Sequence, residues 1–236
     1  MAHQSCMIRH FRHFAELDQE EVDLLGKLEK SPEKIAPGSL LWQEGSRVEV
    51  MAVLSKGWAF SCYTLEDGSR MILDVFLPGD VIGMHEYASR THQSSVETIT
   101  ECTLCRFPHR HLDDIFELSP RLTRIFFTIA ATQQSMLVER MVNLGRRDAR
   151  TKLSHFICEM YSRLSNTNPD MRAEFNLPLS QQMIADTMGL TPVHVSRVFS
   201  QLREQSLVRR DRHRITIPDI EKLSDFADFN NHYLRL

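Results

Sequence analysis

The segment from residue 179 to residue 217, LSQQMIADTMGLTPVHVSRVFSQLREQSLVRRDRHRITI, constrains the fold more than any other part of the chain. Ser180 is a suitable cap for a first short helix, and Gly189 supplies the backbone freedom that a tight turn requires. Thr191 can cap a second helix with Pro192 at its first position, where a missing amide hydrogen costs nothing. Two capped helices joined by a glycine turn predict a helix-turn-helix.

The second predicted helix has an apolar face and a polar face. Its apolar stripe consists of Val195, Val198, Phe199 and Leu202. The opposite face carries short, polar or basic side chains of the kind that read base edges in a major groove. We assign base reading to Val193, Ser196, Arg197 and Gln201. Arg197 is suited to a bidentate contact with guanine.

A basic hairpin is predicted next, because LVRRDRHRITI alternates apolar and basic residues around a turn at Asp211 and Arg212. Val208, Ile215 and Ile217 would anchor its strands. We assign contacts with the DNA backbone to Ser180, Thr191, Ser200, Arg209, Arg210 and Arg212. Two alternatives stay open: a solvated hairpin without a ligand, and an effector-binding module whose helix-turn-helix contacts protein.

The N-terminal half has the sequence pattern of a β-roll or barrel. After an amphipathic helix at residues 18–28, short apolar runs alternate with turns: LLWQEG, VEVMAVLSKG, WAFSCYTLEDGS, RMILDVFLPGD and SVETITECTLCRFP. Asp67 and Gly68 give the sharpest hairpin signal. Evenly spaced short strands favour a roll over a sheet threaded with helices.

A long helix is predicted over residues 120–144, and a second one over residues 149–164. A helix of about 25 residues is long for a small domain, which favours pairing with a second copy of the chain. The predicted dimer interface consists of Leu122, Ile125, Phe126, Ile129, Gln133, Met136 and Arg140. Packing of the helix on its own roll is the alternative. The predicted domains are residues 1–117, 118–147 and 148–236.

Charge and cysteine content agree with a cytoplasmic DNA-binding protein. The net charge of the 236-residue chain is −3, but from Arg146 onward 14 Lys and Arg face 11 Asp and Glu, a net +3. Five cysteines do not suggest a disulfide framework.

The sequence also argues against a membrane protein and an enzyme. No apolar run approaches the ~20 residues of a membrane span, and nothing resembles a signal peptide. The chain has no phosphate loop, nucleophile elbow or His-Glu metal pair, which argues against an enzyme.

The order of a β-roll, a long helix and a winged helix-turn-helix containing GLTPVHVSR resembles the CRP/FNR family, the cyclic-AMP receptor protein and the fumarate-nitrate reductase regulator. The resemblance runs from about Phe14 to Ile220. It implies an α+β fold and a homodimer that binds an inverted-repeat operator on double-stranded DNA and contacts RNA polymerase. Activation is the outcome we expect from such a regulator.

The match on the second helix is partial. Ser196 and Arg197 correspond to the Ser-Arg pair by which the oxygen-sensing branch reads its half-site. Val193 replaces a glutamate of the family, and an apolar side chain cannot accept a hydrogen bond from cytosine. The half-site sequence therefore stays open.

The stretch GDVIGMHEYASRTHQSSVETI resembles the cyclic-nucleotide cassette of the family and departs from it at the charged positions. Met84 stands in place of the ribose-binding glutamate that follows Gly83, and Gln93 in place of the phosphate-binding arginine, while Ser94 agrees. A buried phosphate without its cation is poorly compensated. The sequence predicts that cyclic AMP is not the effector and leaves Gly83, Met84, His85, Gln93 and Ser94 as a candidate effector pocket.

The resemblance also implies two possible metal cofactors, an iron-sulfur cluster and haem, and each requires particular ligand residues. An iron-sulfur cluster ordinarily takes four thiolates, but the N-terminal region has Cys6 alone. Cys102 and Cys105 are three residues apart on a predicted strand, so they would point to opposite faces. His85 aligns with a haem ligand of the carbon-monoxide sensors, although Gly83 replaces their cysteine. No cofactor is predicted: His85 is a candidate haem ligand, or else a structural histidine. His92, His109 and His111 are assigned to solvated loops or a helix start.

Overall fold

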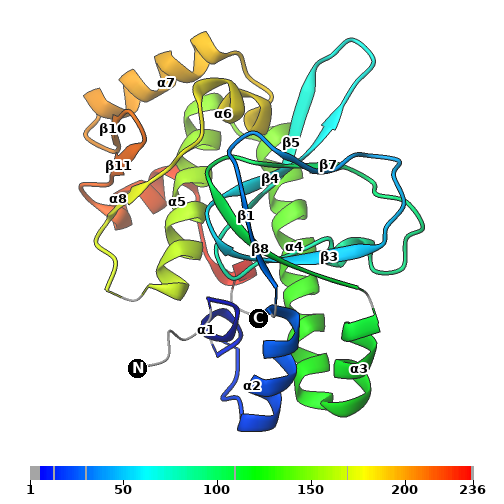
Figure 1. Ribbon diagram of the computed structural model, residues 1–236. Helices are drawn as coiled ribbons and strands as arrows, with labels where there is room; N and C mark the ends of the chain where they lie inside the picture. The colour runs from blue at the N-terminus through cyan, green and yellow to red at the C-terminus, as the bar shows by residue number, and fades with distance from the viewer. Residues whose placement is uncertain (1–5, 13, 30, 109, 169, 235–236) are drawn as a thin grey trace. The chain divides into compact units, whose positions relative to one another are not determined.

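The computed structural model describes residues 6–12, 14–29, 31–108, 110–168 and 170–234, without the side chains of Cys6 and Arg9 (Figure 1). Two compact units emerge from the packing, residues 1–131 and 132–236. The division falls inside the long helix α4 (Pro120–Arg146) and not at residues 117/118 or 147/148. The three-part division of the chain stays a prediction based on sequence.

Two four-stranded antiparallel sheets form the first unit, with the strand orders β1-β8-β3-β6 and β2-β7-β4-β5. The strands are β1 (Pro32–Ile35), β2 (Leu40–Trp42), β3 (Val50–Lys56), β4 (Ala59–Thr64), β5 (Arg70–Phe76), β6 (Val81–Ile82), β7 (Ser95–Thr98) and β8 (Cys102–Pro108). Neighbours in the sheets are mostly distant in sequence, which is the topology of the predicted roll. Strands β4 and β5 form the predicted hairpin, and Gly68 in its turn has a φ of 82°.

Strand β8 separates two apolar clusters of the first unit. Cys102 packs with Trp42 and Phe76 in the cluster between the sheets, whereas Cys105 packs with Phe107 and residues of the helices. Burial raises the pKa of both thiols. The two thiols thus lie on opposite sides of the strand, as the alternation of a strand predicts.

The helices of the first unit are α1 (Cys6–Arg12), α2 (Gln19–Gly26), η1 (Lys27–Glu29), η2 (Met84–Glu86) and α3 (Arg110–Leu118). Helix α2 begins with a capping box, in which Asp18 Oδ1 accepts from the Glu21 amide at 2.9 Å and Glu21 Oε2 accepts from the Asp18 amide at 3.1 Å. Glu21 is buried and also accepts a hydrogen bond from Ser119 Oγ at 2.9 Å. This carboxylate links the start of α2 to the junction of α3 and α4.

Helix α4 corrects the predicted dimer interface. Leu122, Ile125, Phe126 and Ile129 are buried in the core cluster of their own unit. Met136 is also buried, Gln133 is half-buried, and Arg140 pairs with Glu159 of the same chain. The apolar residues of this set and Arg140 are therefore engaged within their own chain, and only Gln133 stays partly accessible. The exposed large apolar residues of the helix are Phe127, Leu137, Val138, Met141 and Val142.

The second unit begins within α4 and holds a helical bundle with a three-stranded sheet. Its further elements are α5 (Ala149–Thr167), β9 (Glu174–Asn176), α6 (Gln181–Met188), α7 (Pro192–Glu204), β10 (Arg209–Asp211), β11 (Arg214–Thr216), α8 (Ile220–Ala227) and η3 (His232–Leu234). The sheet order is β10-β11-β9, and β10 and β11 form the predicted hairpin. Helices and antiparallel sheets in separate segments confirm the α+β class. Within the described residues, no helix is long and apolar enough to span a membrane.

Candidate DNA-binding interface

Helices α6 and α7 begin and end as the local sequence predicts. Ser180 Oγ accepts from the Met183 amide at 3.1 Å and Thr191 Oγ1 accepts from the His194 amide at 3.2 Å. Gly189 has a φ of 63°, a conformation that side chains other than glycine rarely adopt. The hydroxyls assigned to the DNA backbone at Ser180 and Thr191 are therefore already helix caps, although both residues are exposed.

The exposed face of α7 carries the predicted base-reading residues. Val193 is 71% exposed, Ser196 and Arg197 are exposed, and Gln201 is half-buried. On the opposite side Val195, Val198 and Leu202 are buried, which confirms most of the predicted stripe. Phe199 differs from that prediction, because it is half-buried and faces the hairpin. The helix thus exposes Ser196 and Arg197 next to the apolar Val193.

The hairpin beside α7 is the predicted wing. Arg210 pairs with Ile215 in the register of the two strands, and Arg212 forms the turn with a φ of 52°. Val208, Ile215 and Ile217 are buried and anchor the strands. Arg209, Arg212 and Arg214 are exposed, and Arg214 lies 3.3 Å from Glu174. The predicted contacts with the DNA backbone require exposed side chains, and Arg209 and Arg212 meet this requirement.

Arg210, which was also assigned to the DNA backbone, is half-buried, unlike Arg209 and Arg212. Its guanidinium lies over the Phe199 ring, 4.8 Å from the centroid. Nε donates to the Arg212 carbonyl at 2.9 Å and Nη2 donates to the Leu179 carbonyl at 2.7 Å. Burial lowers the pKa of Arg210 because desolvation disfavours the charged form. The side chain joins the wing, the start of α6 and helix α7.

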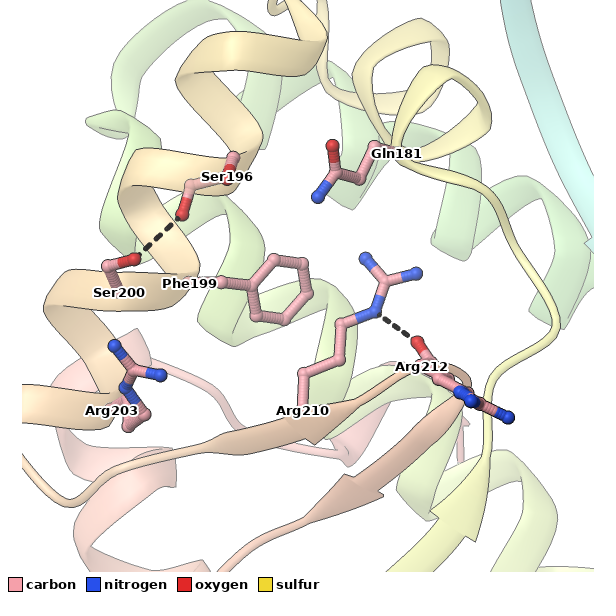
Figure 2. A pocket seen from close by; sticks show the side chains of 7 residues that line it. All are labelled: Gln181, Ser196, Phe199, Ser200, Arg203, Arg210 and Arg212. Atoms are coloured by element: carbon pink, nitrogen blue, oxygen red, sulfur yellow. Dashed lines mark hydrogen bonds between the residues drawn. The ribbon is translucent and has the colours of Figure 1, made fainter.

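A pocket of about 270 Å³ lies between these elements (Figure 2). It is lined by Gln181, Ser196, Phe199, Ser200, Arg203, Arg210 and Arg212. Ser200 Oγ donates to the Ser196 carbonyl at 3.3 Å, one turn earlier in the helix. Three arginines and three neutral polar side chains make this pocket suited to an anion.

The candidate effector residues of the first unit do not share one environment. Gly83 and Ser94 are buried, Met84 is half-buried against the core, and the side chains of His85 and Gln93 are exposed. Gln93 Nε2 donates to the Thr91 carbonyl at 2.9 Å. Gly83 has a φ of 89°, which ends β6 in a bend before the short helix η2. His85 and Gln93 thus lie at the surface, whereas Ser94 lies in the interior.

A buried acid and a buried histidine lie in this loop, and sequence reasoning missed both. Glu86 is 1% exposed and His92 is 3% exposed, which corrects the assignment of His92 to a solvated loop. Glu86 Oε2 accepts from His92 Nδ1 at 2.6 Å, and Oε1 accepts from the Gln93 amide at 2.6 Å. The indole of Trp42 stacks on the His92 ring with centroids 4.7 Å apart. The spacing of six residues across a loop carries no helical or strand period that could have signalled the pair.

The donors for a metal are dispersed in the described part of the chain. It contains no group of three His, Cys, Asp or Glu side chains that could hold a metal ion. The side chain of His85 is 51% exposed and lies 3.7 Å from Glu86 Oε1. The thiol of Cys6 and residue His109 lie outside the described part, and His111 is half-buried in α3. His85 therefore stands on the surface of the one-turn helix η2.

A second buried cluster of charges lies in the second unit and was also not predicted. Glu159 is 1% exposed and accepts from Arg140 Nη2 at 3.0 Å and from the Tyr233 hydroxyl at 3.2 Å. Glu139 lies 2.7 Å from Arg147 Nη2 and 3.3 Å from Nε2 of His155. These contacts join the second half of α4 to α5 and to the C-terminal segment.

Two family models match separate parts of the chain. The cyclic nucleotide-binding domain matches residues 32–119, and the Crp-like helix-turn-helix domain matches residues 151–226. The nitrogen fixation regulation protein FixK of Rhizobium meliloti is 32% identical over 214 residues, which cover 88% of this chain and 94% of FixK. The transcriptional activator protein FnrL of Cereibacter sphaeroides is 26% identical over 228 residues, or 94% of this chain and 90% of FnrL.

Solved structures agree with the fold. FixK2 from Bradyrhizobium japonicum has a TM-score of 0.75 at 24% identity, covering 83% of this chain and 96% of FixK2. A CooA mutant from Carboxydothermus hydrogenoformans has a TM-score of 0.69 at 17% identity, covering 86% and 90%. The likeness to FixK over nearly its whole length, together with the two matched domains, shows that the chain belongs to the CRP/FNR family of transcription regulators.

Proposed function

We propose that the protein is a homodimeric transcription activator that binds an inverted-repeat operator through α7 and contacts RNA polymerase. The observation that carries this proposal is the capped helix α7, which leaves Ser196 and Arg197 exposed beside a wing with exposed arginines. A DNA partner places the protein in the cytoplasm. Family membership also agrees with the expectation that the chain is not an enzyme.

The dimer interface that we propose is the exposed face of α4. Phe127, Gln134, Val138 and Met141 follow one another at steps of seven, four and three residues, which is the heptad spacing of a coiled-coil seam. Phe127 is 76% exposed and Met141 is 66% exposed. An apolar stripe of this kind is costly in water and is covered when two copies of the helix pair. A second copy of the chain is therefore the occupant that fits this face.

We propose that the roll has no site for cyclic AMP. Glu86 places a buried carboxylate on the amide of Gln93, the position where the family resemblance would put the cyclic phosphate. Two anions at one donor repel each other, and the side chain of Gln93 supplies no compensating charge. Haem bound at His85 is less favoured than a roll without a metal cofactor, because the imidazole of His85 lies at the surface. The activity of the regulator is then controlled by an uncharged ligand, by the amount of the protein or by its stability.

Selection of operator sequences from random double-stranded DNA, followed by binding measurements at several salt concentrations, tests the function. Arg197→Ala should weaken binding to the selected operator by ~1–3 kcal/mol and relax the preference at one base. Arg172→Ala removes an equal charge from an exposed site outside α6, α7 and the wing, and should leave that preference unchanged. Equal losses on operator and random DNA for Arg197→Ala would contradict base reading. Wild-type protein that selects no sequence would favour a helix-turn-helix that contacts protein.

A further inference from the structure

We propose that residues 228–234, which we call the C-terminal clasp, hold α5 in one orientation on α4 and thereby set the distance between half-sites that the dimer accepts. The inference rests on the proposed function, because half-site spacing has a meaning only for a dimer on an inverted repeat. It assigns a positioning role to Glu159 and Tyr233, which lie outside the helix-turn-helix and its wing.

Helix α5 connects the proposed dimer face to the recognition helix within the second unit. The second half of α4 exposes Val138 and Met141 on one side and directs Arg140 toward α5 on another. Helix α5 in turn packs against α6 and α7. The orientation of α5 on α4 therefore decides where α7 lies relative to the dimer face.

Glu159 is the centre of the link between α4, α5 and the clasp. Its carboxylate is buried, and its two oxygens have partners on different elements. Oε1 accepts from Arg140 Nη2 of α4 at 3.0 Å and lies 3.9 Å from Arg163 Nη1 of α5. Oε2 accepts from the Tyr233 hydroxyl of the clasp at 3.2 Å. A buried carboxylate is costly without such partners, so any displacement that breaks one of these hydrogen bonds is strongly opposed.

The aromatic side chains of the clasp cover the face of α5 that carries Glu159. His155 precedes Glu159 by four residues, so both side chains lie on the same face of the helix. The Tyr233 ring lies parallel to the buried His155 ring with centroids 6.2 Å apart, and the Phe229 ring meets the His155 ring edge-on at 5.1 Å. Nε2 of His155 lies 3.3 Å from Glu139 Oε1 of α4. The clasp thus covers both polar side chains of α5 that contact α4.

Directional contacts specify an orientation more sharply than apolar packing does. An apolar interface tolerates small adjustments before it loses much stability. The hydrogen bonds from Arg140 and Tyr233 instead require particular distances and angles at the Glu159 oxygens. In a twofold dimer, the same rotation of α5 in each copy displaces the two recognition helices relative to each other. The spacing of the half-sites is therefore the property of the operator that depends most on this link.

Tyr233→Phe is the diagnostic variant, because it removes one hydroxyl and keeps the ring beside His155. Tyr161→Phe is the matched control: it removes a hydroxyl from a half-buried tyrosine of α5 whose ring lies beside Phe175. Binding is measured on operators with identical half-sites at the selected spacing, and one base pair closer or farther apart. We expect wild-type protein and Tyr161→Phe to prefer the selected spacing about thirtyfold, and Tyr233→Phe to prefer it only about fivefold.

This ratio of affinities separates positioning from stability. A variant that is only less stable has a smaller folded fraction and loses the same factor on every operator, so its ratio stays that of the wild type. Thermal unfolding measures the stability of each variant. Arg140→Lys loosens the same carboxylate from the α4 side and should also lower the ratio, which keeps the test available if Tyr233→Phe does not fold. Wild-type ratios in both variants would overturn the inference.

A measurement without DNA distinguishes this inference from the proposed function. A spin-labelled amino acid in place of Val193, an exposed residue at the start of α7, reports the distance between the two recognition helices of a dimer. The distribution of that distance should be broader in Tyr233→Phe than in the wild type. Equal distributions would overturn the role of the clasp, whatever the DNA binding. A broader distribution in a protein that selects no operator would retain the clasp and refute the regulator.

Discussion

The Glu86 carboxylate holds the Nδ1 of His92 at 2.6 Å inside the roll, and both side chains are almost completely buried. The second oxygen of Glu86 accepts from the Gln93 amide, so one acid fixes the two residues that precede the buried Ser94. The loop that would hold an effector in the family is here held by a side chain of the protein itself.

Replacement of one partner of this pair should be strongly destabilising. His92→Phe leaves the Glu86 carboxylate buried without its main partner, which we expect to cost ~3–5 kcal/mol in the free energy of unfolding. Glu86→Gln keeps an acceptor for the Gln93 amide and should cost less. Urea denaturation measures both, and His85→Ala is the control on the exposed neighbour, with an expected change within about 0.5 kcal/mol. A small effect of His92→Phe would show that the pair contributes little to the fold.

A charge in the proposed dimer interface should separate the copies without unfolding them. Met141→Glu places a carboxylate on an exposed position of α4 in both chains, so we expect a folded monomer with much weaker operator binding. Ile129→Glu, which introduces a charge into the core cluster, should instead lower the thermal stability of the chain. Sedimentation and thermal unfolding distinguish the two outcomes. A Met141→Glu protein that remains a dimer would place the interface on another surface.

Acid should weaken the second unit through His155. Burial lowers the pKa of His155 in the folded chain, so the unfolded chain takes up the proton first as the pH falls below about 6.5. Only well above that pH, from about pH 7.5 upward, are both states neutral at this group, so that it adds no pH dependence there. We expect the free energy of unfolding of wild-type protein to fall between about pH 7.5 and about pH 5.5. His155→Gln should show a smaller decrease, and identical pH profiles would exclude His155 as the cause.

The cap of the recognition helix should contribute to both stability and binding. Thr191→Ala removes the hydroxyl that accepts from the His194 amide, at an expected cost of ~1 kcal/mol in the free energy of unfolding. Thr191→Ser keeps the acceptor and should restore most of the loss. If operator affinity falls while stability does not, Thr191 also contacts the DNA backbone, as predicted from the sequence. Denaturation and binding assays on the two variants give the comparison.

Much of the second unit was predictable because its signals are local. Ser180, Gly189 and Thr191 act on the backbone within three residues of themselves, so their spacing predicts both helices and the turn. The hairpin signal at Asp67 and Gly68 is local in the same way. The apolar period also predicted the length of α4 nearly to its end, since an uninterrupted period of 3.6 requires only the sequence of the helix itself.

Tertiary structure decided which face of α4 is free, where Glu86 and His92 lie, and what Arg210 contacts. Ile129 was predicted as an interface residue and Met141 was not, but the core of the first unit covers Ile129, whereas Met141 is exposed. His92 is buried because a distant strand brings Trp42 onto its ring. Arg210 reads as one more basic residue of a wing until Phe199 and the Leu179 carbonyl come within its reach. Caps and turns are fixed by neighbours along the chain, whereas burial and pairing depend on residues that only folding brings together.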